Sequence, residues 1–305
     1  MKIAVVTGAN GFVGSAVVKE LLNNGYKVYA VVRSSHSDRL QGLENTVIVN
    51  CELSEISKLP ELIQEKCDVF YHFAWSGITG VSRANANIQL SNAKYSVEAV
   101  KSAAKIGCKR FVFAGSIVEN ESLYAAYTDG NRPGTEYVYG AAKMAAHIMC
   151  SATSSELSIE YLNGKIINTY GVGEESARLV NSAIRKCIAG ISPEFTAGTQ
   201  NYDFVYIDDV AHAFRLIGEN GKPFTSYVIG SSYAKPLKEF LLEMKEAVAP
   251  DLPFKFGDVP FTGIDLPLSD FDCSKTEKDT GFKAQISFAE GCKRTFEWWK
   301  KLLNN

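Results

Sequence analysis

Short apolar runs alternate with longer amphipathic stretches through the first half of the chain. The runs rich in β-branched and aromatic residues are Lys2–Thr7, Lys27–Val32, Val47–Val49, Val69–Phe73 and Arg110–Ala114. The helical stretches between them include Gly14–Asn23 and the long segment Ile88–Lys105. Strands that alternate with helices in this way pair in parallel through right-handed crossovers. The pattern therefore predicts an α/β fold with a doubly wound parallel sheet.

The alternation becomes less regular in the second half of the chain. The strands expected there are Ile166–Asn168 and Tyr227–Ile229, and the expected helices are Arg178–Ala189, Leu237–Val248 and Phe288–Leu303. No low-complexity linker separates the two halves. We therefore expect residues 1–165 to form the main domain and residues 166–305 to form a smaller region interlocked with it, some of whose segments return to the sheet.

Composition narrows the range of partners. The chain has 305 residues, 46% of them hydrophobic and 22% charged, which is ordinary for a globular protein. No apolar run approaches the roughly 18 residues that a membrane span requires. The formal net charge is -2 and the basic residues are scattered, so neither nucleic acid nor an anionic membrane is expected to bind. A small molecule is the expected partner.

Cysteine and histidine usage argues against a metal centre. The seven cysteines are widely spaced without any C-x-x-C pair, and the four histidines are scattered. This spacing favours reduced thiols over disulfides or a zinc site. The chain runs from Met1 directly into a strand-like segment without a signal-peptide pattern, so we expect a cytoplasmic protein.

A glycine-rich turn follows the first expected strand and opens the first expected helix. Its sequence is Thr7-Gly8-Ala9-Asn10-Gly11-Phe12-Val13-Gly14. Gly8 permits a tight turn, Gly11 lets the backbone approach a pyrophosphate, and Gly14 lets the helix pack closely on the sheet. In this strand–turn–helix context the motif predicts a Rossmann-type dinucleotide-binding domain. Its predicted cofactor contacts are Gly8, Asn10, Gly11, Phe12, Val13 and Gly14.

The residues that follow the second expected strand indicate which cofactor binds. NAD-binding sites carry an acidic residue there for the ribose hydroxyls, whereas this chain has Arg33 followed by Ser34. A guanidinium suits a 2′-phosphate through its charge and its forked donors. NADP(H) is therefore favoured over NAD(H). The remaining expected cofactor contacts are Glu52, Leu53, Phe73, Ala74 and Ile166.

A tyrosine and a lysine stand four residues apart at Tyr139 and Lys143, so they share one face of a helix. A phenol has an ordinary pKa of about 10 and needs a nearby cation to exchange protons near neutrality. Lys143 can supply that charge. Ser116 ends the strand Arg110–Ala114 at the edge where open α/β sheets carry their sites, and its hydroxyl can bond a reacting oxygen.

These motifs, in this order and at these spacings, resemble the extended short-chain dehydrogenase/reductase family, particularly its nucleotide-sugar epimerases, dehydratases and ketoreductases. The resemblance covers nearly the whole chain and includes Asn92, Lys165–Gly173, Tyr202–Val210, Gly281-Phe282 and Trp298-Trp299. It implies a Rossmann domain, a small C-terminal substrate domain, bound NAD(P) and frequently a homodimer through the helices at 88–105 and 139–153.

The resemblance also implies roles for individual residues. Ser116, Tyr139 and Lys143 would form the catalytic triad, with Lys143 also holding the nicotinamide ribose and Asn168 facing the substrate's diphosphate. The full set of expected substrate contacts is Trp75, Ser116, Asn168, Arg178 and Tyr202. No metal ligand is expected.

Several positions depart from the family's pattern. Dehydratases follow the strand-end hydroxyl with an acidic pair, whereas this chain has Ile117-Val118, so elimination of water is not expected. Enzymes that epimerise two further carbons carry a cysteine where Val118 stands. Lys165 and Tyr202 replace two usual arginines, and tyrosine removes the charge that would contact a phosphate.

The favoured interpretation is an NADP(H)-dependent oxidoreductase that reduces the 4-keto group of a nucleotide-diphosphate sugar. The alternative is a nucleotide-sugar 4-epimerase that keeps NAD bound. Both use the same triad, so the triad itself does not separate them. A reductase of a non-sugar ketone or aldehyde and a non-catalytic NADP-binding sensor are further hypotheses.

Overall fold

The computed structural model describes residues 1–33 and 37–304. Within these residues a seven-stranded sheet has the order β11-β6-β5-β4-β1-β2-β3, and every neighbouring pair is parallel. The strands are β1 (Ile3–Thr7), β2 (Lys27–Val32), β3 (Thr46–Asn50), β4 (Val69–His72), β5 (Arg110–Ser116), β6 (Glu160–Ile166) and β11 (Thr225–Ile229). The predicted doubly wound α/β sheet is confirmed.

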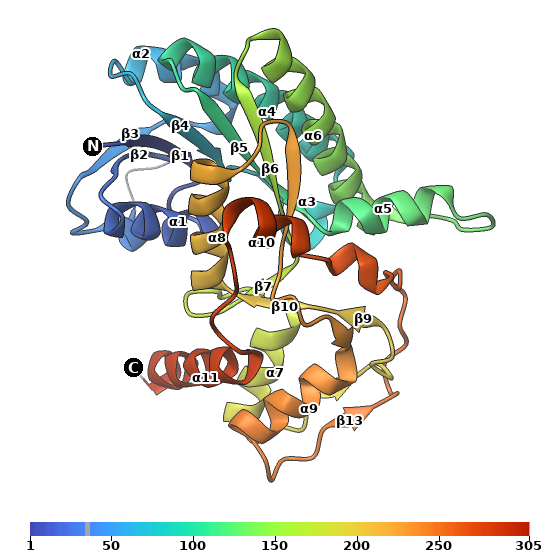
Figure 1. Cartoon of the computed structure of the whole chain (residues 1–305). Coiled ribbons are helices and arrows are strands. Elements are labelled where there is room, and N and C mark those ends of the chain that lie inside the picture. The colour runs from blue at the N-terminus through green and yellow to red at the C-terminus, as the bar shows by residue number, and fades with distance from the viewer. Residues whose placement is uncertain (34–36, 305) are drawn as a thin grey trace.

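Helices cover both faces of this sheet (Figure 1). One face carries α4 (Ala86–Ile106) and α6 (Val138–Glu156), and the other carries α1 (Phe12–Asn23) and α8 (Ile207–Asn220). Successive side chains of a strand point to opposite faces, so Ala4 and Val6 belong to the core under α1 and α8 while Val5 belongs to the other core. Burial on both faces explains why β1 reads as a continuous apolar run.

The expected strand Ile166–Asn168 is wrong. β6 ends at Ile166, and a separate strand, β7 (Asn168–Tyr170), begins two residues later and pairs with β10 (Phe204–Tyr206). β6 escapes prediction because Glu160, Asn163 and Lys165 interrupt its apolar pattern. Asn163 is nevertheless buried, because its amide donates a 2.9 Å hydrogen bond to Ser226 Oγ on β11. A segment from the second half of the chain thus completes the sheet.

The remaining elements form a smaller lobe below the sheet (Figure 1). Its predicted helices are confirmed as α7 (Leu179–Ile188), α9 (Leu237–Val248) and α11 (Phe288–Asn304). The small strands pair as β9 (Asn201–Tyr202) with β12 (Lys235–Pro236) and as β8 (Glu194–Phe195) with β13 (Lys255–Phe256). An aromatic core holds this lobe together, and it includes Phe195, Phe204, Phe240, Phe288 and Trp299.

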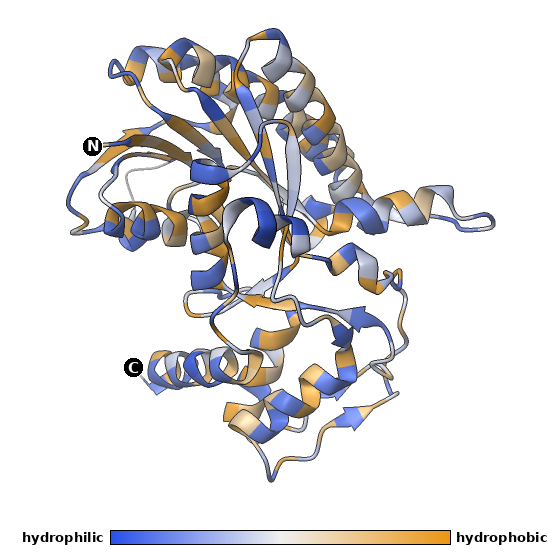
Figure 2. Ribbon diagram, in the orientation of Figure 1, coloured by the Kyte–Doolittle hydropathy of each residue, from blue (hydrophilic) through white to orange (hydrophobic). Residues whose placement is uncertain are grey.

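Shorter elements complete the described chain. They are α2 (Leu59–Leu62), α3 (Gly80–Arg83), α5 (Val118–Tyr127), α10 (Ser274–Thr280) and the 3-10 turns Asp38–Leu40, Leu53–Lys58, Thr135–Tyr137 and Leu268–Phe271. Figure 2 shows hydrophobic and hydrophilic residues alternating along α11, as expected for a helix with one buried side. Among the helices in residues 1–33 and 37–304, none is long and apolar enough to span a membrane.

Phe214 provides a test of how α8 is packed on the sheet. Its fully buried ring meets Phe73 edge-on at 4.7 Å between centroids and fills the space above Gly164. Phe214→Ala should lower the free energy of unfolding by about 3–5 kcal/mol, measured by urea denaturation, because it leaves a cavity. Phe261→Ala, at a 42% exposed phenylalanine, is the control and should change it by less than about 0.5 kcal/mol. Equal effects from the two substitutions would contradict this packing.

Candidate active site

The turn between β1 and α1 brings three backbone segments into close contact. Gly8 has a φ of +67°, and a Cβ at Gly14 would lie 2.2 Å from the Gly8 carbonyl oxygen, so both positions require glycine. The Gly11 amide donates to the Gly8 oxygen at 2.9 Å and closes the turn. No side chain caps the start of α1. The turn thus has the geometry that a phosphate group needs at a helix start.

The neighbouring side chains of the turn contact other parts of the chain. Asn10 Oδ1 accepts a 3.2 Å hydrogen bond from the Arg39 amide. Phe12 and Val13 are half-buried and pack against the aromatic core of the smaller lobe. Their predicted contacts with a cofactor stay predictions. The turn therefore stands where the sheet and the smaller lobe meet.

The other predicted cofactor contacts follow the carboxyl ends of neighbouring parallel strands. Arg33 is exposed at the end of β2, and Ser34 lies outside the described residues. Beyond β3, Glu52 is exposed and Leu53 is half-buried, and Ile166 is the last residue of β6. The structure thus brings these residues to one edge of the sheet.

Phe73 and Ala74 follow β4 and are tied to the end of β1. The Phe73 amide donates to the Thr7 carbonyl oxygen at 3.2 Å, and the Ala74 amide donates to Thr7 Oγ1 at 3.3 Å. Thr7 Oγ1 also bonds His72 Nδ1 at 2.8 Å, and burial lowers the pKa of His72 to about 3. His72 is therefore neutral near pH 7, and its hydrogen bond to Thr7 holds the ends of β1 and β4 together.

Lys143 is the central cation of the site. Its Nζ donates a 2.9 Å hydrogen bond to the Ala114 carbonyl oxygen on β5 and lies 3.8 Å from the centre of the Trp75 ring. The side chain is buried, and this burial lowers its pKa to about 7. Nζ also lies 5.9 Å from the centre of the Tyr139 ring, one helical turn earlier on α6. The structure brings the predicted tyrosine and lysine together.

Tyr139 lies half-buried between aromatic and cationic neighbours. The Trp75 ring meets it edge-on at 6.0 Å between centroids, and the Arg83 guanidinium carbon lies 4.2 Å from its ring centre. Burial raises the pKa of the phenol, while the charges of Arg83 and Arg178 act to lower it. The effect of burial is the larger, so the pKa of Tyr139 lies above its ordinary value, and the two arginines limit that rise.

Ser116 ends β5, two residues after the carbonyl group that holds Lys143. Its amide donates a 2.7 Å hydrogen bond to Glu119 Oε1 on α5. Glu119 is buried, and this burial raises its pKa. Its carboxyl group therefore supports the end of β5 from within the protein. A Cβ on Gly115 would lie 2.3 Å from Asn163 Oδ1 and 2.8 Å from Glu119 Oε1, which explains the glycine before the serine.

Sequence reasoning assigned no specific role to Arg83 and missed Glu119. Glu119 stands three residues after the strand-end serine, a spacing that could have suggested a carboxylate bonded to that residue's amide. The role of Arg83 had no such signal, because Arg83 ends the short helix α3, which follows a loop whose path is set by contacts with α4. Asn92 Oδ1 accepts from the Ser76 amide at 2.9 Å, and Gln89 Nε2 donates to the Gly77 carbonyl oxygen at 2.8 Å.

Gln89 also fixes Trp75, a predicted substrate contact, by accepting a 2.7 Å hydrogen bond from its indole nitrogen. Apart from Ser116 on β5, the remaining predicted substrate contacts are Asn168, Arg178 and Tyr202, which come from the smaller lobe. Asn168 Nδ2 donates to the Asp203 carbonyl oxygen at 3.1 Å, so its amide already joins two segments of that lobe. Tyr202 is half-buried and burial raises its pKa to about 12, whereas Arg178 is exposed just before α7.

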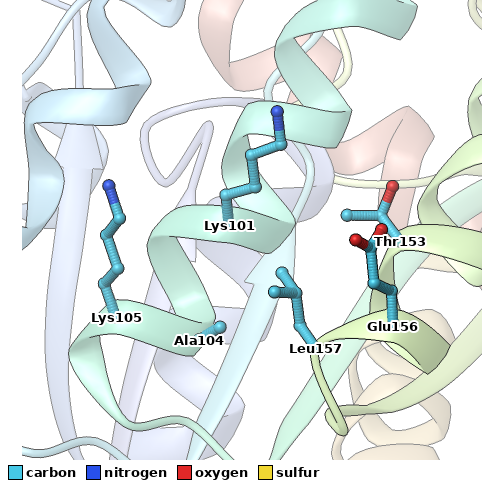
Figure 3. A pocket seen from close by; sticks show the side chains of 6 residues that line it. All are labelled: Lys101, Ala104, Lys105, Thr153, Glu156 and Leu157. Atoms are coloured by element: carbon cyan, nitrogen blue, oxygen red, sulfur yellow. The ribbon is translucent and has the colours of Figure 1, made fainter.

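An open hollow of about 440 Å³ lies elsewhere, on the outer surface of α4 and α6 (Figure 3). Its lining residues are Lys101, Ala104, Lys105, Thr153, Glu156 and Leu157. None of the predicted triad residues lines it, so it is separate from the candidate active site. Across the described residues, no group of three or more His, Cys, Asp or Glu is placed to hold a metal ion.

The buried ammonium of Lys143 should destabilise the protein in the absence of ligands. Its pKa in the folded state is about 7 against an ordinary value of 10.5, so the unfolded chain binds more protons between these pH values. The stability of the wild type should therefore rise with pH across this window. Lys143→Met should melt at a higher temperature than the wild type at neutral pH, and the difference should shrink toward the ordinary lysine pKa. Lys300→Met, at an exposed lysine, is the control, and a pH-independent difference for Lys143→Met would refute the buried charge.

Comparison with known proteins agrees with this arrangement. The family model described as NAD dependent epimerase/dehydratase family matches residues 4–230. The dTDP-D-glucose 4,6-dehydratase of Mus musculus is 24% identical over 334 aligned positions, which cover 100% of this chain and 90% of the mouse protein.

Two solved structures share the fold. The UDP-glucose 4-epimerase of Thermotoga maritima, solved with UDP-glucose, superposes with a TM-score of 0.81 at 22% identity, covering 99% of this chain and 100% of the other. The Bordetella bronchiseptica enzyme WbmF, solved with NADH, has a TM-score of 0.78 at 18% identity, covering 99% of this chain and 93% of the other. With a family model that spans most of its length, the chain belongs to the NAD dependent epimerase/dehydratase family.

Proposed function

We propose that the chain is a nucleotide-sugar 4-epimerase that keeps its nicotinamide cofactor bound through the catalytic cycle. The observation that carries this proposal is the position of Tyr139, half-buried between a cation pair, beside a strand end that offers Ser116 and no free carboxyl group. Such a site can move a proton to and from a hydroxyl group. The T. maritima enzyme, a UDP-glucose 4-epimerase, has the same fold and supports this proposal.

In this proposal each residue of the triad has a separate role. Tyr139 takes the proton from the sugar's 4-hydroxyl group. It returns the proton after the 4-keto sugar has rotated in the site and presents its opposite face. Ser116 donates a hydrogen bond to the same oxygen, and Lys143 stabilises the phenolate. The bound nicotinamide supplies hydride exchange at the carbon that carries this oxygen. Gly8, Gly11 and Gly14 would hold its pyrophosphate against the start of α1.

Elimination of water is disfavoured, although the mouse relative is a dehydratase. The two residues after Ser116 are Ile117 and Val118, and neither can protonate a leaving hydroxyl group. The next acid, Glu119, is buried with one carboxylate oxygen bonded to the Ser116 amide. A carboxylate committed in this way supports the strand end and is poorly placed to protonate a substrate.

Retention of the cofactor is supported by Arg39. Its amide bonds Asn10 in the glycine turn, and its Nη2 donates to the Gly173 carbonyl oxygen at 2.6 Å. It also forms an ion pair with Glu175 at 3.3 Å. Arg39 thus ties the glycine turn to the segment after β7, and these contacts oppose separation of the two parts. An epimerase needs no cofactor exchange, whereas a reductase releases its cofactor at every turnover.

The second candidate is an NADP(H)-dependent 4-ketoreductase, and Arg33 favours it. The guanidinium is exposed at the end of β2, where NAD-binding sites place an acidic residue. The bound NADH of WbmF favours NAD instead. Identification of the resident cofactor therefore bears on both candidates.

The test begins with the cofactor content of the purified protein. We expect nearly one equivalent of NAD(H) or NADP(H) after gel filtration, released only by denaturation. The protein should then epimerise one of a panel of UDP-, dTDP-, CDP- and GDP-sugars without added cofactor. A cofactor-free protein that consumes NADPH with a 4-keto sugar would establish the ketoreductase. Turnover of a non-sugar carbonyl alone, or NADP binding without any turnover, would favour the two remaining hypotheses.

Tyr139→Phe should lower this turnover by about 10²- to 10⁴-fold while the bound cofactor is kept, because only the proton-transferring hydroxyl group is removed. Tyr127→Phe, at an 80% exposed tyrosine on α5, is the matched control and should behave like the wild type. Unchanged turnover in Tyr139→Phe would refute the role of this phenol.

We further propose that two copies of the chain associate through the outer surface of α4 and α6. Exposed apolar side chains gather on these two helices and include Leu90, Ile148 and Met149, with Leu157 at the end of α6. The hollow shown in Figure 3 lies on the same surface. A second copy would cover this apolar area, which is otherwise unfavourable in contact with water.

Ile148→Glu should convert the dimer to a monomer in sedimentation velocity experiments, because it places a charge in the apolar contact. Leu302→Glu, at an exposed leucine on α11, is the control and should leave the association unchanged. A wild-type protein that sediments as a monomer would exclude this interface.

A further inference from the structure

We propose that Arg83 and Arg178 form a binding site for a negatively charged group of the sugar nucleotide, beside the ring of Tyr139. The inference rests on the proposed function, because it takes Tyr139 as the group that meets the sugar. The anion is a carboxylate on the sugar ring or the diphosphate, and both present oxygen atoms that a guanidinium recognises through paired hydrogen bonds.

Arg83 is a half-buried charge whose donors are mostly uncommitted. Its guanidinium carbon lies 4.2 Å from the centre of the Tyr139 ring, and Nη1 donates a 3.3 Å hydrogen bond to the Ile78 carbonyl oxygen. Burial lowers its pKa, which means that the surroundings oppose the charged form. A guanidinium carries five N–H donors, so one hydrogen bond and one ring contact leave most of them available.

Arg83 also lacks an ion-pair partner within the described part of the chain. No carboxylate oxygen there lies within 4.0 Å of its nitrogens. Glu121 on α5 is the carboxyl group whose charge acts on it from a longer distance. Burial raises the pKa of Glu121, and the charge of Arg83 opposes that rise. Because desolvation makes an unpaired charge less favourable, an anion supplied by the ligand would provide the missing partner.

Arg178 approaches the same position from the smaller lobe. It precedes α7, and its Nη1 lies 3.7 Å from Glu174 Oε2. Its charge lowers the pKa of both Arg83 and Tyr139, so all three groups lie within electrostatic reach of one another. Two like charges within electrostatic reach oppose each other, and an anion that binds Arg83 would be attracted by the charge of Arg178 as well.

This placement makes the two arginines specificity-determining residues. The ring of Tyr139 is the part of the site that meets the reacting hydroxyl group in the proposed mechanism. An anion held by Arg83 therefore lies close to the reacting sugar carbon. Binding at this point would orient the sugar, and a neutral ligand would leave the cation uncompensated.

The test compares Arg83→Met and Arg178→Met with the wild type on UDP-glucuronate, UDP-glucose and UDP. Binding is measured by calorimetry and turnover by sugar analysis, both on protein that carries its own cofactor. We expect a loss of about 10- to 100-fold in affinity and kcat/KM for Arg83→Met, because a charged hydrogen-bonding partner is removed. Arg83→Lys should recover part of this loss, because it keeps the charge without the fork.

The pattern of losses identifies the anion. A loss confined to UDP-glucuronate assigns it to a sugar carboxylate, and an equal loss on all three ligands assigns it to the diphosphate. Arg185→Met is the matched control, because Arg185 is also half-buried and stacks on an aromatic ring, 5.1 Å from the centre of Trp299. Its affinities should equal those of the wild type, which separates loss of the anion site from loss of ring packing.

The two proposals fail in different ways. Binding of these ligands without turnover in the wild type would overturn the epimerase and leave the anion site standing if Arg83→Met still weakens binding. Affinities within about twofold of the wild type in both Arg83→Met and Arg178→Met would overturn the anion site, whatever the turnover. Absence of any measurable binding in the wild type would overturn it as well.

Discussion

Parallel pairing of the central strands is the constraint on which the rest of this structure depends. Parallel strands end at the same edge of the sheet, so the glycine turn after β1, the Phe73-Ala74 segment after β4 and Ser116 at the end of β5 meet there. Residues far apart in the sequence thereby share one small region. The hydrogen bonds from Phe73 and Ala74 to Thr7 then hold this edge in a fixed shape.

Two cations in this region, Lys143 and Arg83, have little access to water, which makes their charged forms less favourable. Lys143 is buried beside Trp75, and its Nζ donates to the Ala114 carbonyl oxygen. Arg83 is half-buried beside the Tyr139 ring, and its Nη1 donates to one backbone carbonyl group. Both charges are less favourable in the protein than in water. In the proposed mechanism they become favourable when the phenol loses its proton or when a negatively charged ligand binds, so the same burial that opposes stability would favour function.

Much of the fold was predictable because local pattern and buried position agree. The β1 strand, the helices α9 and α11 and the glycine turn all have apolar spacing or turn residues that admit one structure. β6 was not predictable for the opposite reason, because Asn163 is buried by a partner on β11 that lies more than sixty residues away. The same holds for the separation of β6 from β7 at Ile167, where the chain leaves the main sheet for the smaller lobe.

The residues of the candidate site also differ in how far the sequence predicts them. Tyr139, Lys143 and the turn glycines stand in fixed spacings within single elements, so the sequence alone was sufficient to select them. Arg83 reaches Tyr139 only because Asn92 and Gln89 hold the preceding loop on α4, and Arg178 comes from the other lobe. Groups that recognise a substrate lie on such loops, since a loop can change its path without disturbing the sheet. The residues of the proposed proton transfer are therefore encoded locally, whereas the cations proposed to select the substrate are placed by tertiary contacts.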